Sequence, residues 1–445
     1  MGSNWREATI EEVSHKVAMG PFGSSIKVET FVPEGIPVIS GQHLWGMKLN
    51  DQPGFNFITE EHAQRLKNAN VQRGDVIFTH AGSIGQAAYI PNSSAYERYI
   101  ISQRQFYMRC DTDVVIPEYV VAFFKTPEGQ HKLLANAVQT GVPSIAQPVS
   151  YLRTIVIPVP PLSEQKAIAH ILGTLDDKIE LNRKKSETLE AMARALFKSW
   201  FVDFDPVIAK MEGRWKQGES LPGMPAGLWD LFPDKLVDSE LGEIPEGWKT
   251  GFLGDIASSA RDNVMAEDIG QDTPYIGLEH MPKHCIALSD WGQGESVESN
   301  KHRFQKGDIL FGKLRPYFHK VGIAPVDGVC STDIVVVRPR ISSFFGVTLG
   351  FTSSNEFVDF TNMTSTGTRM PRTSWTSMAN YELAIPSIAL AESYNCFVTP
   401  LLDRILANTF ELHTLSELRD ALLPKLISGE LRVKGAEKLL DKAGV

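Results

Sequence analysis

Two long stretches of the chain repeat apolar residues in alternating steps of four and three. The first runs from Ser163 to Trp200 and contains no proline. This spacing places the apolar side chains on one stripe of an α-helix, as in the seam of a coiled coil. Ser163 is a candidate N-cap, and about 38 residues at ~1.5 Å each form a rod of roughly 57 Å. The stripe consists of Ile168, Leu172, Leu175, Ile179, Asn182, Ser186, Leu189, Ala193, Leu196 and Trp200.

A second stretch near the C-terminus carries the same stripe, displaced by about 226 positions. Its members are Tyr394, Val398, Leu401, Ile405, Asn408, Leu412, Leu415, Arg419, Leu422 and Leu426. Both stripes have asparagine at the same step, Asn182 in the first and Asn408 in the second. Two unrelated amphipathic helices would often share a period but less often a polar interruption, so the sequence favours a duplication.

Neither helix can bury its stripe alone, so we expect the two to pack against each other. An antiparallel pair would bring Asn182 and Asn408 together near the midpoints, where a buried polar pair fixes the register. The residues expected in the helix-pair interface are Leu172, Leu175, Ile179, Asn182, Leu189, Leu196, Val398, Leu401, Ile405, Asn408, Leu415 and Leu422.

The region before each helix reads as a mixed, strand-rich domain with short apolar runs separated by Gly and Pro. In the first region the expected strands include 36–39, 75–78, 105–108 and 154–157, and helical patterns cover 60–67, 117–125 and 129–138. The second region retraces the first in the same order. Trp248 matches Trp5, and Lys306-Gly307-Asp308-Ile309-Leu310-Phe311 matches Arg73-Gly74-Asp75-Val76-Ile77-Phe78.

The order domain, helix, domain, helix predicts an α+β fold with a pseudo-two-fold internal repeat. Two similar mixed α/β domains are expected to be separated by a pair of long antiparallel coiled-coil helices. The predicted boundaries are 1–160 for the first domain, 161–235 for the first helix and a linker, 236–387 for the second domain, and 388–445 for the second helix and tail.

Two similar domains held apart by paired rods would suit a long, repetitive and nearly two-fold ligand such as duplex DNA. Half-sites one helical turn apart lie about 34 Å apart on one face of the duplex. The net charge of −9 by itself argues against a nucleic-acid partner. DNA binding is therefore expected to be local, with other surfaces covered by other subunits.

Small polar loops with glycine are the candidates for DNA contact, because their backbone can approach a partner closely. The two copies differ in sequence at these loops. Thr79-His80-Ala81-Gly82-Ser83 in the first copy corresponds to 312–320 in the second, and 142–145 corresponds to 368–373. Arg and Lys can bond guanine edges, Gln and Asn can bond adenine, and the remainder can hold phosphates. The alternative is that these are simply solvated basic loops. The candidate DNA-binding residues are Ser24, Lys27, Gln42, His43, Thr79, His80, Ser83, Gln86, Arg104, Gln139, Thr140, Ser144, Arg261, Lys313, Arg315, Tyr317, Lys320, Thr368, Arg369 and Arg372.

Catalytic and cofactor motifs are missing from the sequence. It contains no GxGxxG, Walker or HExxH pattern, and His280, His284 and Cys285 lack a fourth metal ligand. We expect no catalytic residue, no metal and no cofactor bound by this chain. Four scattered cysteines and no apolar run of ~18 residues favour a reduced, cytoplasmic protein without a membrane span.

Several phrases, in this order, resemble the specificity subunit of Type I restriction–modification systems. They include Gly20-Pro21-Phe22-Gly23-Ser24, 73–77, Pro158-Val159-Pro160-Pro161-Leu162-Ser163-Glu164-Gln165 leading into the first helix, 197–206 and 242–248. The resemblance covers essentially the whole chain. Each phrase is only moderately specific, whereas the ordered set is highly specific.

The resemblance implies a non-catalytic DNA reader with two target-recognition domains, each reading one part of a split sequence, and a helix pair that sets the gap. It also implies two modification subunits carrying S-adenosylmethionine, and restriction subunits that translocate and cut. Two other interpretations stay open: a coiled-coil scaffold without DNA specificity, and a fused methyltransferase or nuclease with an unrecognised motif.

Overall fold

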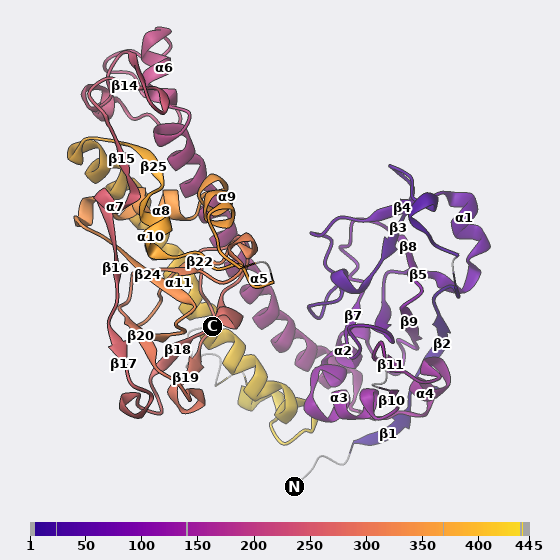
Figure 1. The fold of residues 1–445 in the computed structure, drawn as a ribbon. Helices are drawn as coiled ribbons and strands as arrows, with labels where there is room; N and C mark the ends of the chain where they lie inside the picture. Colours follow the sequence, from indigo (N-terminus) through magenta and orange to yellow (C-terminus); the bar gives the residue numbers. More distant parts are fainter. Residues whose placement is uncertain (1–4, 24, 139–140, 368, 437, 439–445) are drawn as a thin grey trace. The chain divides into compact units, whose positions relative to one another are not determined.

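The computed structural model describes residues 5–23, 25–138, 141–367, 369–436 and 438. They form two compact units, residues 1–179 with 415–445 and residues 180–414. Both divisions of the chain fall inside the two long helices, α5 (Leu162–Phe201) and α11 (Ile388–Ile427), which are prominent in Figure 1. Each unit therefore contains a strand-rich domain together with one part of each long helix.

Both stripes of the long helices are buried. None of their positions is exposed, and Leu172, Leu175, Val398, Ile405, Leu415 and Leu422 are among the fully buried side chains. Helix α5 begins one residue before Ser163, and the carbonyl of Pro161 accepts the first helical hydrogen bond, so the N-cap expectation for Ser163 is wrong. Proline can occupy this place because the first helical N–H groups need no partner within the helix.

The two helices run antiparallel within each unit. In the first unit Arg419 is paired with Asp176, and Arg432, beyond the end of α11, with Glu164. In the second unit the Tyr394 hydroxyl donates to the carbonyl of Ala193.

Asn182 and Asn408 were expected to lie close together, and among the described residues no hydrogen bond joins their side chains. Asn408 Nδ2 donates instead to Ser186 Oγ at 3.2 Å, one helical turn from Asn182. Within the described residues, Asn182 Nδ2 and Asn408 Oδ1 have no hydrogen-bond partner, although both side chains are buried. The polar interruption therefore joins the two stripes through Ser186, which is a neighbour of Asn182 on the surface of its own helix.

The first unit is built on two four-stranded sheets. Helix α2 (Pro117–Lys125) packs on β6 and β7, with α3 (Pro127–Leu134) directly after it. The first sheet has the order β2 (Ser14–Met19), β9 (Gln105–Cys110), β6 (Asp75–Thr79), β7 (Ala87–Tyr89), all antiparallel. The second has the order β4 (Asn56–Ile58), β3 (Ile36–Ile39), β8 (Arg98–Ile101), β5 (Asn70–Gln72), with β3 and β8 parallel. The remaining elements are β1 (Arg6–Thr9) paired with β12 (Val156–Val159), β10 (Ala137–Val138) paired with β11 (Ser144–Ile145), α1 (Glu60–Arg65) and α4 (Pro148–Thr154).

The second unit repeats this topology, with one strand added at an edge of its second sheet. Its first sheet has the order β16 (Ala257–Ala260), β24 (Ile334–Pro339), β21 (Ile309–Gly312), β22 (Val321–Ile323). Its second has the order β17 (Asn263–Val264), β20 (Lys301–Phe304), β23 (Gly328–Cys330), β18 (Pro274–Ile276), β19 (Gly292–Gln293), with β18 and β23 parallel. Strand β15 (Lys249–Phe252) pairs with β25 (Glu382–Ile385), as β1 pairs with β12. The other elements are β13 (Leu236–Ser239), β14 (Gly242–Pro245), α6 (Asp205–Met211), α7 (Leu253–Ile256), α8 (Phe345–Thr352), α9 (Asn355–Met363) and α10 (Trp375–Ala379).

The predicted fold class is confirmed: two similar mixed α/β regions accompany two long helices. Local errors lie at element ends. The helix predicted over 129–138 spans Pro127–Leu134, because Thr126 caps it through the Gly129 N–H. The strand predicted to begin at Thr154 begins at Val156, since Thr154 ends α4.

Candidate nucleic-acid interface

Backbone hydrogen bonds join three loops of the first unit beyond the end of β6. The His80 N–H donates to the carbonyl of Arg104, and the Gly82 N–H donates to that of Pro143. The Ile145 N–H donates in turn to the carbonyl of His80. These bonds hold the loops around residues 80, 104 and 144 against one another, and we call this arrangement the loop frame.

The second unit contains the same loop frame, bond for bond. The Lys313 N–H donates to the carbonyl of Asp333, the Arg315 N–H to that of Pro371, and the Thr373 N–H to that of Lys313. Isolated bridges repeat as well, Ala81 with Ser144 and Leu314 with Arg372. The loops that the sequence matched to each other therefore occupy equivalent places in their own units.

The side chains on the two frames differ in charge. His80, Gly82, Arg104 and Ser144 in the first frame correspond to Lys313, Arg315, Asp333 and Arg372 in the second. Gly82 has φ +84°, and Arg315 adopts the same left-handed region with φ +50°. An arginine in that region carries a backbone cost of about 1 kcal/mol, so the frame rather than local preference imposes it.

Two candidates in the first unit are buried and do not face solvent. Thr79 is 1% exposed, and its hydroxyl donates to Gln86 Oε1 at 2.9 Å. His43 is also 1% exposed and stacks on Phe55, while its Nε2 faces the carbonyl of Gly54 at 2.8 Å. Both polar groups therefore have partners inside the domain and are not presented at its surface.

His80 and Arg104 lie on the surface of the first frame. His80 Nε2 is 3.1 Å from the carbonyl of Gln103, and burial lowers the pKa of the imidazole, which favours a neutral ring donating to that carbonyl. The Arg104 guanidinium extends over Gly82, where Nη1 would lie 3.4 Å from an added Cβ. Gly41 approaches Gln86 Oε1, so the turn that carries exposed Gln42 lies beside the same frame.

Two further basic or titratable residues, Arg261 and His302, lie in the neighbourhood of Lys313 on the second frame. Burial lowers the pKa of His302, and the nearby charges of Lys313 and Arg261 lower it further. These three side chains therefore share one neighbourhood although they lie on different segments. His302 was not foreseen, since its pattern in the sequence is that of an ordinary strand residue.

Lys320 is held back from the surface of the second frame. Its Nζ donates to the carbonyl of Leu278, and burial, with the charge of Lys283 added, lowers its pKa. Lys283 lies 4.2 Å from the ring centroid of Phe318, beside exposed Tyr317. Lys283 was not among the predicted DNA-binding residues. Its cation–π contact with Phe318 and its charge near Lys320 place it beside this group of basic side chains.

The remaining candidates divide by exposure. Lys27, Ser83, Arg261, Arg369 and Arg372 are exposed, and Gln86, Ser144, Lys313 and Arg315 are half-buried. Among the residues that the structure describes, no contact brings Lys27 to the first frame. Ser24, Gln139, Thr140 and Thr368 lie outside the described residues.

A buried ion pair anchors the strand that leads into each frame. Asp75, at the start of β6, receives Arg109 Nε at 2.8 Å and Nη2 at 2.7 Å, and it also accepts the Gln72 N–H. Asp308 receives both nitrogens of Arg338 at 2.7 Å and accepts the Gln305 N–H in the same way. Removing either carboxylate would leave its arginine without the bidentate partner that orients it.

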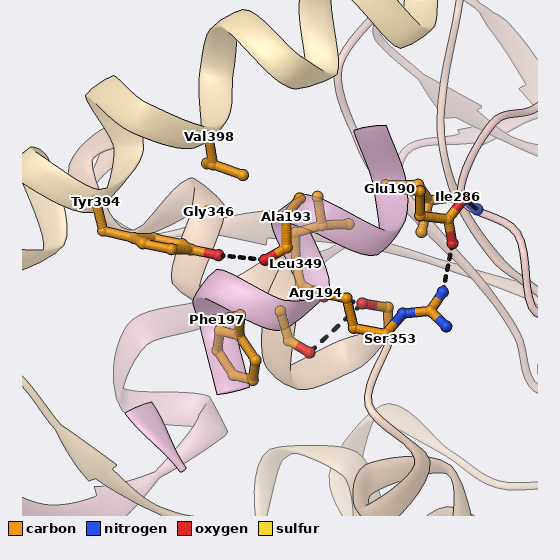
Figure 2. Close-up of a pocket in the computed structure, with 11 residues that line it drawn as sticks. Glu190, Ala193, Arg194, Phe197, Ile286, Gly346, Leu349, Ser353, Tyr394 and Val398 are labelled. Atoms are coloured by element: carbon orange, nitrogen blue, oxygen red, sulfur yellow. Dashed lines mark hydrogen bonds and ion pairs between the residues drawn. The ribbon is translucent and has the colours of Figure 1, made fainter. Parts of the chain in front are cut away.

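A small cavity in the second unit lies where α8 packs on the long helices, among Phe197, Gly346, Gly350 and Tyr394 (Figure 2). Its volume is about 20 Å³, which is room for about one water molecule. Buried Glu190 stands at its edge, where its carboxylate is paired with Arg194 and accepts the Ile286 N–H at 3.0 Å. The cavity is a packing joint and is too small for an organic ligand.

No group of three or more His, Cys, Asp or Glu side chains in the ranges that the structure covers could hold a metal ion. No helix in the same part of the chain is both long enough and apolar enough to cross a membrane.

Comparison with known proteins shows what the chain is similar to. Residues 2–191 match the family model of the Type I restriction modification DNA specificity domain. The MjaIX specificity subunit of Methanocaldococcus jannaschii is 26% identical over 97% of this chain and 94% of its own length. The HindI specificity subunit of Haemophilus influenzae is 23% identical over 96% of this chain and 100% of its own length.

The fold agrees with that similarity. The crystal structure of a Type I restriction–modification S subunit from M. genitalium superposes with a TM-score of 0.58 at 17% identity, covering 95% of this chain and 96% of that one. Residues 2–191 match the DNA specificity domain, and nearly the whole chain is similar to specificity subunits of Type I restriction–modification enzymes.

Proposed function

We propose that this chain reads a bipartite DNA sequence, with one loop frame addressing each half-site. The observation that carries the proposal is the repeated frame: the same backbone hydrogen bonds position different polar side chains in the two units. A common backbone approaches a duplex in the same way, whereas the side chains determine which bases are favoured. Different side chains on the two frames imply two different half-sites.

The partners in this proposal carry the chemistry. The chain would be a non-catalytic scaffold for two modification subunits, which bind S-adenosylmethionine and methylate adenine, and for restriction subunits that translocate and cut. The acidic net charge of −9 supports a surface that mostly faces protein. Such a complex would act on DNA in the cytoplasm.

The test uses the chain co-expressed with its modification subunits. The complex is incubated with S-adenosylmethionine and DNA carrying randomised half-sites, and the methylated molecules are sequenced. We expect one split motif with two different halves, and no methyl transfer by the chain alone. Methylation without a split motif would refute the proposal, and transfer by the chain alone would favour a fused methyltransferase.

The helix pair would set the gap between the half-sites. Removing residues 181–187 and 407–413 together takes one heptad from each helix at the level of the contact between Asn408 and Ser186. Seven residues correspond to about 10 Å of helix, the length of roughly three base pairs. The preferred gap should shorten by up to about three base pairs, with both halves of the motif unchanged. An unaltered gap in an active complex would remove the spacer role.

A further inference from the structure

Each frame has one arginine at a certain pair of positions, but the arginine occupies a different position of the pair in each frame. The first frame has Arg104 and Ser144, where the second has Asp333 and Arg372. In the second frame the two side chains form an ion pair, with Arg372 Nε 3.2 Å from Asp333 Oδ1 and Nη2 3.4 Å from Oδ2. The Arg372 side chain is still 51% exposed, so the pair lies at the surface of the frame.

The geometry of this pair leaves half of the guanidinium available. A guanidinium has two edges on which two N–H groups point the same way, one formed by Nε with one Nη and the other by the two Nη atoms. Asp333 occupies the first edge. The second edge has the donor spacing that matches guanine O6 and N7 in the major groove.

The charge of the pair favours a base edge over a phosphate. Arg372 with Asp333 is neutral, and a neutral pair releases no counterion when it meets the DNA backbone. The carboxylate would also repel a phosphate beside it. A guanine edge bears no formal charge, so it accepts the two hydrogen bonds without that repulsion.

We propose that Arg372 recognises a guanine in the half-site addressed by the second unit, and that Asp333 is the positioning residue that holds its guanidinium. This rests on the proposed DNA-reading function and assigns one specificity-determining pair within it. Arg104 is the natural comparison. Among the described residues no carboxylate is paired with it, so Arg104 keeps its full charge at the equivalent frame.

The experiment measures base preference at every position of both half-sites with the intact complex, using the same randomised library. Arg372→Lys keeps the charge but loses the fork, and preference at one position of the second half-site should fall on the order of 10- to 100-fold. Asp333→Asn should relax that same position by a smaller factor, while the first half-site stays unchanged. A purely structural role for Asp333 would instead weaken all positions of the second half-site together.

Salt dependence separates a base contact from a phosphate contact. The double variant Arg372→Gln, Asp333→Asn changes no net charge and should leave the slope of log K against log salt unaltered while the base preference is lost. Arg104→Ala serves as the charge control and should reduce that slope by about one if it touches a phosphate. An unchanged preference in Arg372→Lys, or a slope lowered by about one in the double variant, overturns the assignment. A parent complex with no split motif would instead refute the proposed function.

Discussion

The packing of α8 against the long helices of the second unit depends on a glycine. Replacing this glycine should show how tightly the contact is packed. A Cβ added at Gly350 would lie 2.1 Å from Phe197 Cδ2 and 2.4 Å from Cε2. The Phe197 ring is 3% exposed and meets Phe351 edge-on at 4.9 Å between ring centroids. It therefore has little room to withdraw.

Two opposing effects determine the size of the change. Alanine in place of glycine inside a helix gains about 1 kcal/mol in propensity. Overpacking a core by one carbon costs about 1–3 kcal/mol. The overlap at 2.1 Å is severe, so strain should prevail and Gly350→Ala should destabilise the second unit by about 1–2 kcal/mol.

A second background reverses the sign. Phe197→Ala alone should cost about 3–5 kcal/mol, because it leaves a cavity in the core. Within that variant the overlap is gone, so Gly350→Ala should stabilise by about 0.5–1 kcal/mol. Gly173 lies in the part of α5 that belongs to the first unit, and an added Cβ there would have no atom of another segment within 4 Å, so Gly173→Ala is the control that should stabilise the first unit, followed by circular dichroism, in either background.

The assay is urea unfolding of the full chain, followed by far-UV circular dichroism and by tryptophan fluorescence. Of the eight tryptophans, only Trp5 and Trp45 lie in the first unit, so fluorescence reports mainly on the second. The reasoning is refuted if Gly350→Ala leaves the parent as stable as before, or if its sign is the same in both backgrounds.

Three further perturbations test other contacts. Asp75→Ala should destabilise the first unit by about 2–3 kcal/mol. This is less than the cost of breaking a fully buried ion pair, because the Arg109 side chain is 31% exposed. Urea unfolding that shows no loss of stability would contradict the anchoring role of the pair. Glu190→Gln tests how the stability of the protein depends on the ionisation of this carboxyl. Burial raises its pKa in the native state above 4.5, so the parent should lose stability relative to the variant as pH rises from about 4.5. Paired thermal melts between pH 4 and 8 measure this difference, and a difference that does not change with pH would argue against the raised pKa. Asn408→Leu should raise the free energy of unfolding by about 1 kcal/mol, because it removes a buried amide that has only part of its hydrogen bonds. The altered register of the two long helices should at the same time lower methylation by the complex. A less stable variant would show that the hydrogen bond to Ser186 outweighs the cost of burying the amide.

Much of the architecture was readable from the chain because helical and strand periodicities are local. The stripe from Ile168 to Trp200 marks α5 from residues a few positions apart, and its counterpart marks α11. The duplication was equally visible, since matching phrases such as 73–78 and 306–311 recur in order, and each became the same strand of the same sheet. The loops expected to correspond also do so.

The candidate interface was only partly readable, because exposure and pairing depend on segments far apart in sequence. His43 and Thr79 have the chemistry of DNA contacts, yet Phe55 and Gln86 enclose them. The stripe likewise predicted a polar step shared by both helices, but not that Asn408 would donate its hydrogen bond to Ser186.

The sequence by itself determined the repeated order of domains and helices, because each depends on spacing along the chain. Only the tertiary structure decided which polar side chains reach the surface and which neutralise one another. Arg372 and Asp333 show the reason: 39 positions separate them, and only the hydrogen-bonded frame brings a carboxylate onto one edge of that guanidinium. Periodicity contains no information about such a meeting, since it is set by the packing of loops from different strands.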